Sequence, residues 1–204
     1  MRVRIRVQTD CEHGRCVAQP VLIRAAPGTG KTWSIQQLLY LLSKRAQDQP
    51  EDERLFVPMV IYVQKLAHLL RAQNDFPPVG VAWLKLYLDA EEKQGNLAPA
   101  CNGDQEATCK ANKRARHMLE QAIDLRTITL LVDGIDEAAE LKEKVEDFVI
   151  NHLVPLGIRV VATSRPEGVR LRLYQHQFVI INLGKVRDSE TAACSTHAAR
   201  LMLA

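Results

Sequence analysis

Apolar residues along the chain fall into two kinds of segment, short continuous runs and longer sets with helical spacing. The continuous runs predict buried strands at residues 17–24, 55–63, 127–132, 158–162 and 178–181. The sets in which apolar residues recur every three or four positions predict helices at residues 32–46, 64–71, 81–93, 111–124 and 140–153. Strands that alternate with helices are typical of a mostly parallel central sheet covered on both faces. The pattern therefore predicts an α/β fold with three layers.

Prolines and polar residues interrupt these predicted elements. Pro58 lies inside the second apolar run and removes one donor from the ladder of backbone hydrogen bonds, which favours a place at the edge of the sheet. Residues 74–80, with Pro77 and Pro78, break the chain between two helices. Residues 95–109 are mostly small and polar, so we expect a loop there.

The chain before the first core strand carries two features with competing interpretations. Residues 1–8 alternate arginine with valine or isoleucine, which predicts a half-buried strand with a basic outer face; a targeting or nucleic-acid-binding arm is the alternative. Cys11, His13 and Cys16 lie close together, but zinc needs a fourth ligand at suitable spacing and no later C-x-x-C pair supplies one. We expect a strand and a loop over residues 1–16 and assign no metal there.

Length and composition describe one ordinary globular domain. The 204 residues, 47% hydrophobic and 25% charged, are too few for two full α/β domains. We expect one domain over residues 17–183 and a polar tail over residues 184–204, with a short helix at 198–203. The net charge of +3 gives no argument for a nucleic-acid partner. We interpret the basic start of the 111–124 helix as a solvated face.

Nothing in the sequence predicts export or insertion into a membrane. The longest apolar run has the length of a strand, well below the ~18 residues of a membrane-spanning helix. Charged residues interrupt the first twenty positions, so these lack the apolar core of a secretory signal. The five cysteines are odd in number and scattered, which favours reduced thiols and a cytoplasmic location.

The segment Ala25–Thr32 reads Ala-Ala-Pro-Gly-Thr-Gly-Lys-Thr and joins the first core strand to the first helix. Such a loop concentrates backbone N–H groups, and the helix adds its positive end, so the segment suits phosphate. Gly28 and Gly30 allow conformations that a Cβ would block. Lys31 would reach the β- and γ-phosphates, and the Thr32 hydroxyl would hold Mg²⁺. The residues expected to bind the nucleotide are Pro27, Gly28, Thr29, Gly30, Lys31 and Thr32.

Ala25 departs from the strict pattern G-x-x-x-x-G-K-[ST], because it occupies the position of the first glycine. A positive φ at this alanine would cost about 1 kcal/mol, which would weaken phosphate binding rather than abolish it. The alternative interpretation of the whole segment is a glycine-rich turn between a strand and a helix that binds no ligand.

A second strand ends in acids that would lie at the same edge of the sheet. The apolar residues 130–132 lead into Asp133, and Asp136 and Glu137 follow. Ligands bind beyond the carboxyl ends of parallel strands. Asp133 would therefore bind Mg²⁺, mostly through water, and Asp136 or Glu137 would orient or deprotonate an attacking water. The alternative is a strand followed by the acidic first turn of a helix.

A third strand ends at Arg165, and Pro166 prevents its continuation. At this edge a guanidinium can bind a γ-phosphate through two hydrogen bonds. The alternative for Arg165 is a surface arginine at the end of a strand.

In this order the three segments resemble the NACHT domain of the signal-transducing STAND class of P-loop NTPases. P-G-T-G-K-T resembles its Walker A motif, L-L-V-D-G-I-D-E its Walker B motif, and A-T-S-R-P its arginine-bearing segment. Gly134 occupies the position at which many other P-loop ATPases place their second acid. The resemblance covers residues 17–183 and implies a three-layer P-loop NTPase fold, truncated before the lid and winged-helix domains.

The family resemblance implies a strand order and an activity. The strand before Arg165 would lie between the other two motif-bearing strands, with the Pro58 strand further out. The chain would be a regulatory switch that binds ATP or ADP, hydrolyses ATP slowly with Mg²⁺, and forms a nucleotide-dependent homo-oligomer. By position, the metal ligands would be Thr32 and Asp133, and the catalytic residues Asp136, Glu137 and Arg165.

Other functions stay open at this stage. We expect the family's lid and winged-helix domains to lie outside this sequence, which leaves a fragment or a lone nucleotide-binding interaction module that does not hydrolyse ATP. A mechanical AAA-type ATPase, with Arg170 or Arg172 acting on a neighbouring subunit, fits the spacing of the acids less well. A Ras-like GTPase is disfavoured because the sequence has no guanine-reading [NT]-K-x-D segment.

Overall fold

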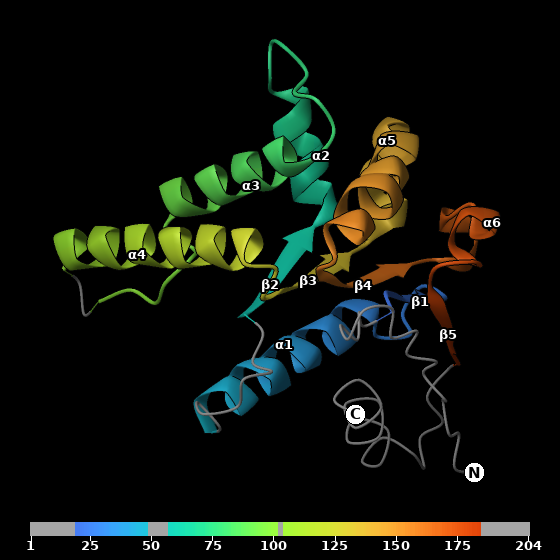
Figure 1. Ribbon diagram of the computed structural model, residues 1–204, viewed down its shortest axis with the longest axis horizontal. Helices are drawn as coiled ribbons and strands as arrows, with labels where there is room; N and C mark the ends of the chain where they lie inside the picture. Colours follow the sequence, from blue (N-terminus) through green and yellow to red (C-terminus); the bar gives the residue numbers. More distant parts are fainter. Residues whose placement is uncertain (1–18, 49–56, 102–103, 185–204) are drawn as a thin grey trace.

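The computed structural model describes residues 19–48, 57–101 and 104–184 (Figure 1). The strand predicted at residues 1–8, the cysteine-containing loop that follows it, and the helix predicted at residues 198–203 lie outside the described residues.

A five-stranded sheet forms the centre of the described chain (Figure 1). Its strands are β1 (Val21–Ala25), β2 (Val57–Tyr62), β3 (Ile128–Asp133), β4 (Arg159–Ser164) and β5 (Val179–Leu183). Their order across the sheet is β2-β3-β4-β1-β5, and every pairing is parallel. The predicted parallel sheet is therefore confirmed, and each of the five predicted core strands overlaps an observed one.

The strand order agrees with the two expectations on topology. β4, which ends just before Arg165, lies between β1 and β3. Within the described part of the chain β2 pairs only with β3. Pro58 therefore lies in an edge strand, where a missing ladder donor is tolerated.

Helices cover both faces of this sheet. α1 (Lys31–Asp48) lies on one face, and the other described helices lie on the opposite face (Figure 1). These are α2 (Val63–Arg71), α3 (Val81–Gln94), α4 (Gln105–Asp124), α5 (Lys142–Asp147) and α6 (Leu171–Tyr174). None of the described helices is both long enough and apolar enough to cross a membrane.

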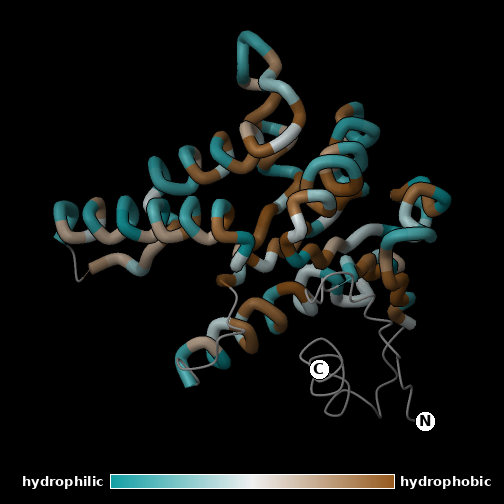
Figure 2. Tube along the Cα trace, in the orientation of Figure 1, coloured by the Kyte–Doolittle hydropathy of each residue, from teal (hydrophilic) through white to brown (hydrophobic). Residues whose placement is uncertain are grey.

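Two apolar cores join the layers. On one face, Ile35 and Leu38 of α1 pack with apolar residues of β1, β3 and β4. The larger core lies on the opposite face and contains the buried rings of Trp83, Tyr87 and Phe148, the first and last of which have centroids 5.0 Å apart. Figure 2 shows hydrophilic residues along α3 and α4 away from the sheet. Successive side chains of a strand face opposite sides, so each central strand contributes to both cores.

The loop predicted over residues 95–109 is too long, because α4 begins at Gln105 and not at residue 111. The Asp104 carboxylate caps the helix by accepting hydrogen bonds from two backbone N–H groups of the first turn, at 2.9 and 3.0 Å. The amide oxygen of buried Asn112 accepts two more N–H groups from the preceding loop, at 2.8 and 3.1 Å. These side chains fix the end of the loop against α4.

The continuous helix predicted over residues 140–153 is also wrong. The segment begins within a 3-10 helix (Ile135–Leu141), continues through α5, and ends in a π-helix (Phe148–Leu153). Further 3-10 turns occur at Val154–Leu156 and Pro166–Gly168. The apolar residues expected to face inward are nevertheless buried, so the predicted face is confirmed although the helix is interrupted.

A kink at Ala139 interrupts the 3-10 helix just before α5. Its φ of 52° and ψ of −123° are disfavoured for any residue with a Cβ. The Arg71 guanidinium of α2 spans the kink, since it donates to the Ala138 carbonyl (3.4 Å) and pairs with the Glu140 carboxylate (2.5 Å). A contact from a neighbouring helix therefore accompanies the strained residue.

Candidate functional site

The loop between β1 and α1 has the backbone expected of its glycines. Gly28 (φ 75°) and Gly30 (φ 89°) both lie in the left-handed region that favours glycine. The Thr29 hydroxyl donates a hydrogen bond to the Ala26 carbonyl (2.6 Å), which closes the turn. α1 follows directly, has 18 residues and carries no acid in its first turn. The loop thus meets the positive end of a long helix, where N–H groups lack partners within the helix.

The strain anticipated at Ala25 is absent. Ala25 is the last residue of β1, is 1% exposed, and does not have a positive φ. Its carbonyl oxygen accepts a hydrogen bond from Lys31 Nζ (3.2 Å). The departure from the strict glycine pattern therefore carries no conformational cost in this backbone.

Lys31 and Thr32 begin α1 at the mouth of the loop. An ammonium group has three N–H donors, so the contact with Ala25 leaves two for a ligand. Thr32 is exposed. Within the described residues no hydrogen bond joins Thr32 to Asp133, the two predicted metal ligands.

Asp133 is buried at the carboxyl end of β3, with 6% of its surface exposed. Thr163 of β4 donates a hydrogen bond to Asp133 Oδ1 (2.5 Å), and the same hydroxyl accepts the Gly134 N–H (2.9 Å). Gly134 has a φ of 80°, and a Cβ on it would lie 2.9 Å from the Glu137 side chain. A buried carboxylate needs a hydrogen-bond donor, and Thr163 supplies one while fixing the turn that leads to the next acids.

Asp136 contacts Arg165 through both of its carboxylate oxygens. Oδ1 accepts the backbone N–H of Arg165 (2.9 Å), and Oδ2 pairs with Nε of the same residue (2.9 Å). The Asp136 side chain is 8% exposed and that of Arg165 is 46% exposed. The ends of β3 and β4 are therefore linked by an acid whose partner reaches solvent.

Glu137 lies within electrostatic range of the charged residues among the predicted site residues. Glu137 is exposed at the surface, but partial desolvation raises the pKa of its carboxyl, and the charges of Asp136 and Asp133 raise it further. The positive charges of Lys31 and Arg165 act in the opposite direction. The lysine of the loop, the acids after β3 and the arginine after β4 therefore all lie within electrostatic range of the Glu137 carboxylate.

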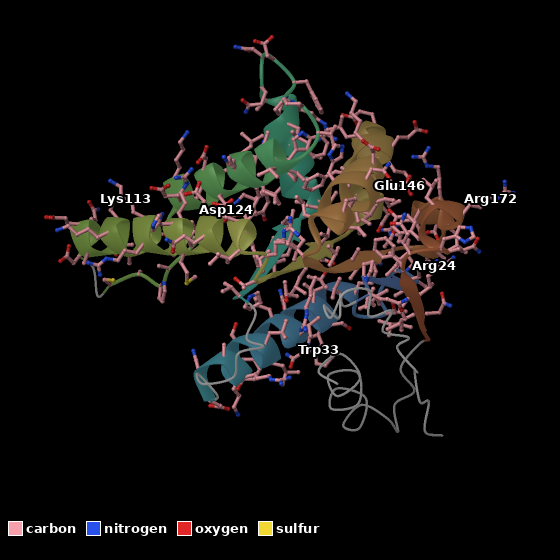
Figure 3. All side chains as sticks on the ribbon, viewed as in Figure 1. Arg24, Trp33, Lys113, Asp124, Glu146 and Arg172 are labelled. Carbon is pink, nitrogen blue, oxygen red and sulfur yellow. The ribbon has the colours of Figure 1, made fainter. Side chains whose placement is uncertain are left out.

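Arg24 ties this edge of the sheet to its neighbours. Its Nη2 donates to the Pro166 carbonyl (3.2 Å), and its Nη1 donates to the Asn182 side chain of β5 (3.4 Å). Figure 3 labels Arg24 on the side of the sheet where β4 and α6 lie. The sequence analysis assigned Arg24 no role in the site.

An open depression of about 660 Å³ adjoins the acids. Its lining residues are Gln64, Asp136, Glu137, Ala139, Lys142, Arg165, Glu167 and Gly168. No residue of the loop between β1 and α1 lines it. Asp136, Glu137 and Arg165 therefore border a depression that is lined by neither Asp133 nor the loop.

The sequence analysis also assigned no role to two further residues that shape the site. Thr163 holds Asp133, and the signal available for it was a polar residue at the end of an apolar strand. Gly168 packs against Asp136, because a Cβ on Gly168 would lie 2.3 Å from the Asp136 Cβ. Nothing in the sequence around Gly168 marks that contact, since the two residues are brought together only by the fold.

The same acids do not form a self-contained metal site. Among the described residues, no group of three or more His, Cys, Asp or Glu side chains could hold a metal ion. Cys11, His13 and Cys16 lie outside those residues.

Comparison of the chain with protein-family models, with curated proteins and with solved structures finds no match. The structure by itself establishes an α/β fold with an all-parallel sheet over the described residues.

Proposed function

We propose that this protein binds ATP and ADP with Mg²⁺ and hydrolyses ATP slowly, as a regulatory NTPase. One observation carries the proposal: the glycine loop and Lys31 follow the carboxyl end of β1, and the neighbouring parallel strands β4 and β3 lead at the same edge of the sheet to Arg165 and to Asp133 and Asp136. Parallel sheets bind ligands beyond the carboxyl ends of their strands. At this edge of the sheet the cationic side chains Lys31 and Arg165 suit phosphates, and the carboxylates suit a metal cation that accompanies them.

The loop residues fit a row of phosphates. Positive φ at Gly28 and Gly30 allows a close approach of ligand to backbone, and the start of α1 adds N–H groups and the positive end of the helix. Lys31 adds an ammonium at the same place. The nucleotide-binding residues would be Pro27, Gly28, Thr29, Gly30, Lys31 and Thr32.

The residues also fit Mg²⁺ bound together with a nucleotide. Oδ1 of Asp133 accepts the hydrogen bond from the Thr163 hydroxyl, whereas Oδ2 makes no hydrogen bond with a described residue. Mg²⁺ commonly binds proteins through one or two oxygen ligands and completes its shell with water and phosphate oxygens. Asp133 and the Thr32 hydroxyl would be those ligands. Bound there, Mg²⁺ would neutralise part of the charge on the phosphates.

Glu137 has the environment of a general base. Its raised pKa brings the carboxylate closer to the basicity that proton abstraction requires. The Arg165 guanidinium reaches solvent beside it and would bind the γ-phosphate. In this account Glu137 accepts a proton from water and Arg165 stabilises negative charge on the phosphoryl oxygens.

Resemblance to the NACHT domain of the STAND class supports a signalling role. The three motifs occur in the family's order, and the strand order β3-β4-β1 agrees with the arrangement that the resemblance implies. A switch of this kind would form a homo-oligomer with ATP and not with ADP. Light scattering on the purified chain with each nucleotide measures that difference.

ATP hydrolysis tests the proposal and separates it from a module that binds without turnover. We expect wild-type protein to bind Mg²⁺–ATP in the micromolar range and to release phosphate slowly. Glu137→Gln keeps the shape of the side chain but removes the base, so binding should persist while phosphate release falls roughly 100-fold or more. Phosphate release that is unaffected by Glu137→Gln assigns hydrolysis to another source, and binding with no release at all favours the non-hydrolysing module.

A further inference from the structure

We propose that Asp136 is a positioning residue that aims Arg165 at the γ-phosphate and thereby makes the site prefer ATP to ADP. The inference rests on the proposed function. It assigns different roles to Asp136 and Glu137, which the sequence alone does not distinguish. It is carried by the contacts between the ends of β3 and β4.

Asp136 fixes Arg165 at two points. One oxygen accepts the backbone N–H at 2.9 Å, which sets where the chain leaves β4. The other oxygen pairs with Nε at 2.9 Å, which sets the direction of the side chain. Because guanidinium is planar, a fixed backbone N–H and a fixed Nε together restrict where the two Nη groups can lie. Those Nη groups are the ones left to bind a ligand.

The packing around Asp136 resists movement of this pair. Asp136 is almost fully buried, and Gly168 lies so close that a Cβ would be 2.3 Å from the Asp136 Cβ and 2.6 Å from the Ser164 Oγ. The Gly168 N–H donates to the Arg165 carbonyl (2.9 Å), which closes the turn after β4. Arg24 holds the same turn from β1 through the Pro166 carbonyl. Asp136 therefore packs tightly against the turn that carries Arg165.

These contacts distinguish Asp136 from Glu137. Both carboxylate oxygens of Asp136 are committed to Arg165, so accepting a proton from water would weaken its ion pair. Glu137 is the more exposed of the two and borders the same depression. The geometry assigns the arginine to Asp136 and leaves the water to Glu137.

A γ-phosphate ligand explains why this positioning would matter for selectivity. ATP and ADP share the phosphates that the loop and Lys31 would hold, and only ATP carries the group that Arg165 would bind. Losing the position of Arg165 should then weaken ATP binding and leave ADP binding unchanged. A merely structural role for Asp136 would weaken both nucleotides alike.

The experiment measures the dissociation constants of Mg²⁺–ATP and Mg²⁺–ADP by calorimetry for wild type, Asp136→Ala, Asp136→Asn and Arg165→Ala. Asp136→Ala should lose roughly tenfold in ATP affinity, as for a charged hydrogen bond, with less than about a twofold change for ADP. Asp136→Asn keeps an oxygen for the Arg165 N–H but loses the ion pair, so its ATP loss should be smaller. The matched control is Asp124→Asn at the exposed end of α4, which should bind both nucleotides as wild type does (Figure 3).

The double variant Asp136→Ala/Arg165→Ala separates positioning from an independent effect. If Asp136 acts through Arg165, the double variant binds ATP no more weakly than Arg165→Ala alone. Additive losses, or equal losses for ATP and ADP, overturn the inference. Should Asp136→Ala fail to fold, as judged by circular dichroism, Asp136→Asn alone decides between the two patterns. Wild-type protein that binds neither nucleotide rejects the proposed function itself, a result distinct from failure of this inference.

Discussion

Thr163 donates a hydrogen bond to Asp133 across neighbouring strands, with 2.5 Å between the two oxygens. Both residues are buried at the carboxyl ends of β4 and β3. The same hydroxyl accepts the N–H of Gly134, so a single side chain orients the carboxylate and the turn after it. Polar groups in a buried position are stabilising only when they are paired, and here the pairing also fixes the acid assigned to Mg²⁺.

Replacing Thr163 by valine keeps the shape of the side chain and removes the hydroxyl. The change leaves Asp133 Oδ1 and the Gly134 N–H without their partner, so the free energy of unfolding should fall by about 1–3 kcal/mol. In the presence of ATP, the affinity for Mg²⁺ should fall roughly tenfold, as is typical when a metal ligand loses its supporting hydrogen bond. Urea unfolding and a Mg²⁺ titration at fixed ATP measure the two effects.

Thr129→Val is the matched control for that change. The Thr129 hydroxyl on β3 is also buried but has no hydrogen-bond partner among the described residues. Removing it should leave stability unchanged or raise it, because no bond is lost and an unpaired polar group disappears. Equal destabilisation by the two substitutions would contradict a specific role for Thr163.

Gly168→Ala should destabilise the turn that carries Arg165. The new Cβ would lie 2.3 Å from the Asp136 Cβ, so backbone must move to accept it. We expect a loss of about 1–3 kcal/mol, the range for overpacking a well-packed site. At Gly184 a Cβ would meet no atom of the described residues within 4 Å, so Gly184→Ala should stay within about 0.5 kcal/mol of wild type in the same denaturant titration. Similar stability for both variants would show that the Gly168 contact is not tight in solution.

Ala139→Gly should stabilise the protein, against the usual direction of such a change. Relief of the disfavoured conformation at Ala139 should raise the free energy of unfolding by about 1–3 kcal/mol, and the added freedom of glycine in the unfolded chain should lower it by about 0.5–1 kcal/mol. The net gain should be about 1 kcal/mol. Ala115→Gly inside α4 serves as the control, since it should cost about 1 kcal/mol. Losses of the same sign at both positions would mean that the kink is not strained.

The pH dependence of hydrolysis should report the Glu137 carboxyl. Its pKa is raised by partial desolvation and by Asp136 and Asp133, more than Lys31 and Arg165 lower it. A base works only when deprotonated, so kcat/KM, which reports the pKa of the free protein, should rise with pH through a midpoint above the usual value for glutamate, about 4.3. The measurement is kcat/KM for phosphate release from pH 4 upward, with folding checked at each pH. A midpoint at or below the usual value would contradict the role of Glu137.

The parts of the structure that the sequence predicted are those encoded by local pattern. Apolar runs located the strands, and Pro58 indicated the edge because proline lacks a donor wherever it occurs. Gly28 and Gly30 have the positive φ expected of a tight loop between a strand and a helix. Asp104 could have been read as a helix cap, but the polar composition around it favoured a loop.

The parts that the sequence did not predict depend on contacts between distant residues. Alanine favours helices, so nothing at Ala139 indicates a kink that accompanies packing against Arg71 of another helix. The site shows the same limit. Asp133, Asp136 and Glu137 could be recognised as candidate acids, but their different partners, Thr163 for one and Arg165 for another, follow from the pairing of β3 with β4.

The most direct test of the central claim is a calorimetric titration of Mg²⁺–ATP into wild type, Lys31→Met and Lys44→Met. Both lysines lie on α1, but only Lys31 begins the helix beside the glycine loop, whereas Lys44 is exposed near its other end. We expect Lys31→Met to weaken ATP binding by roughly tenfold or more, because a charged hydrogen bond to phosphate is lost, and Lys44→Met to bind as wild type does. ATP binding of equal strength in all three proteins would contradict a phosphate site at this loop.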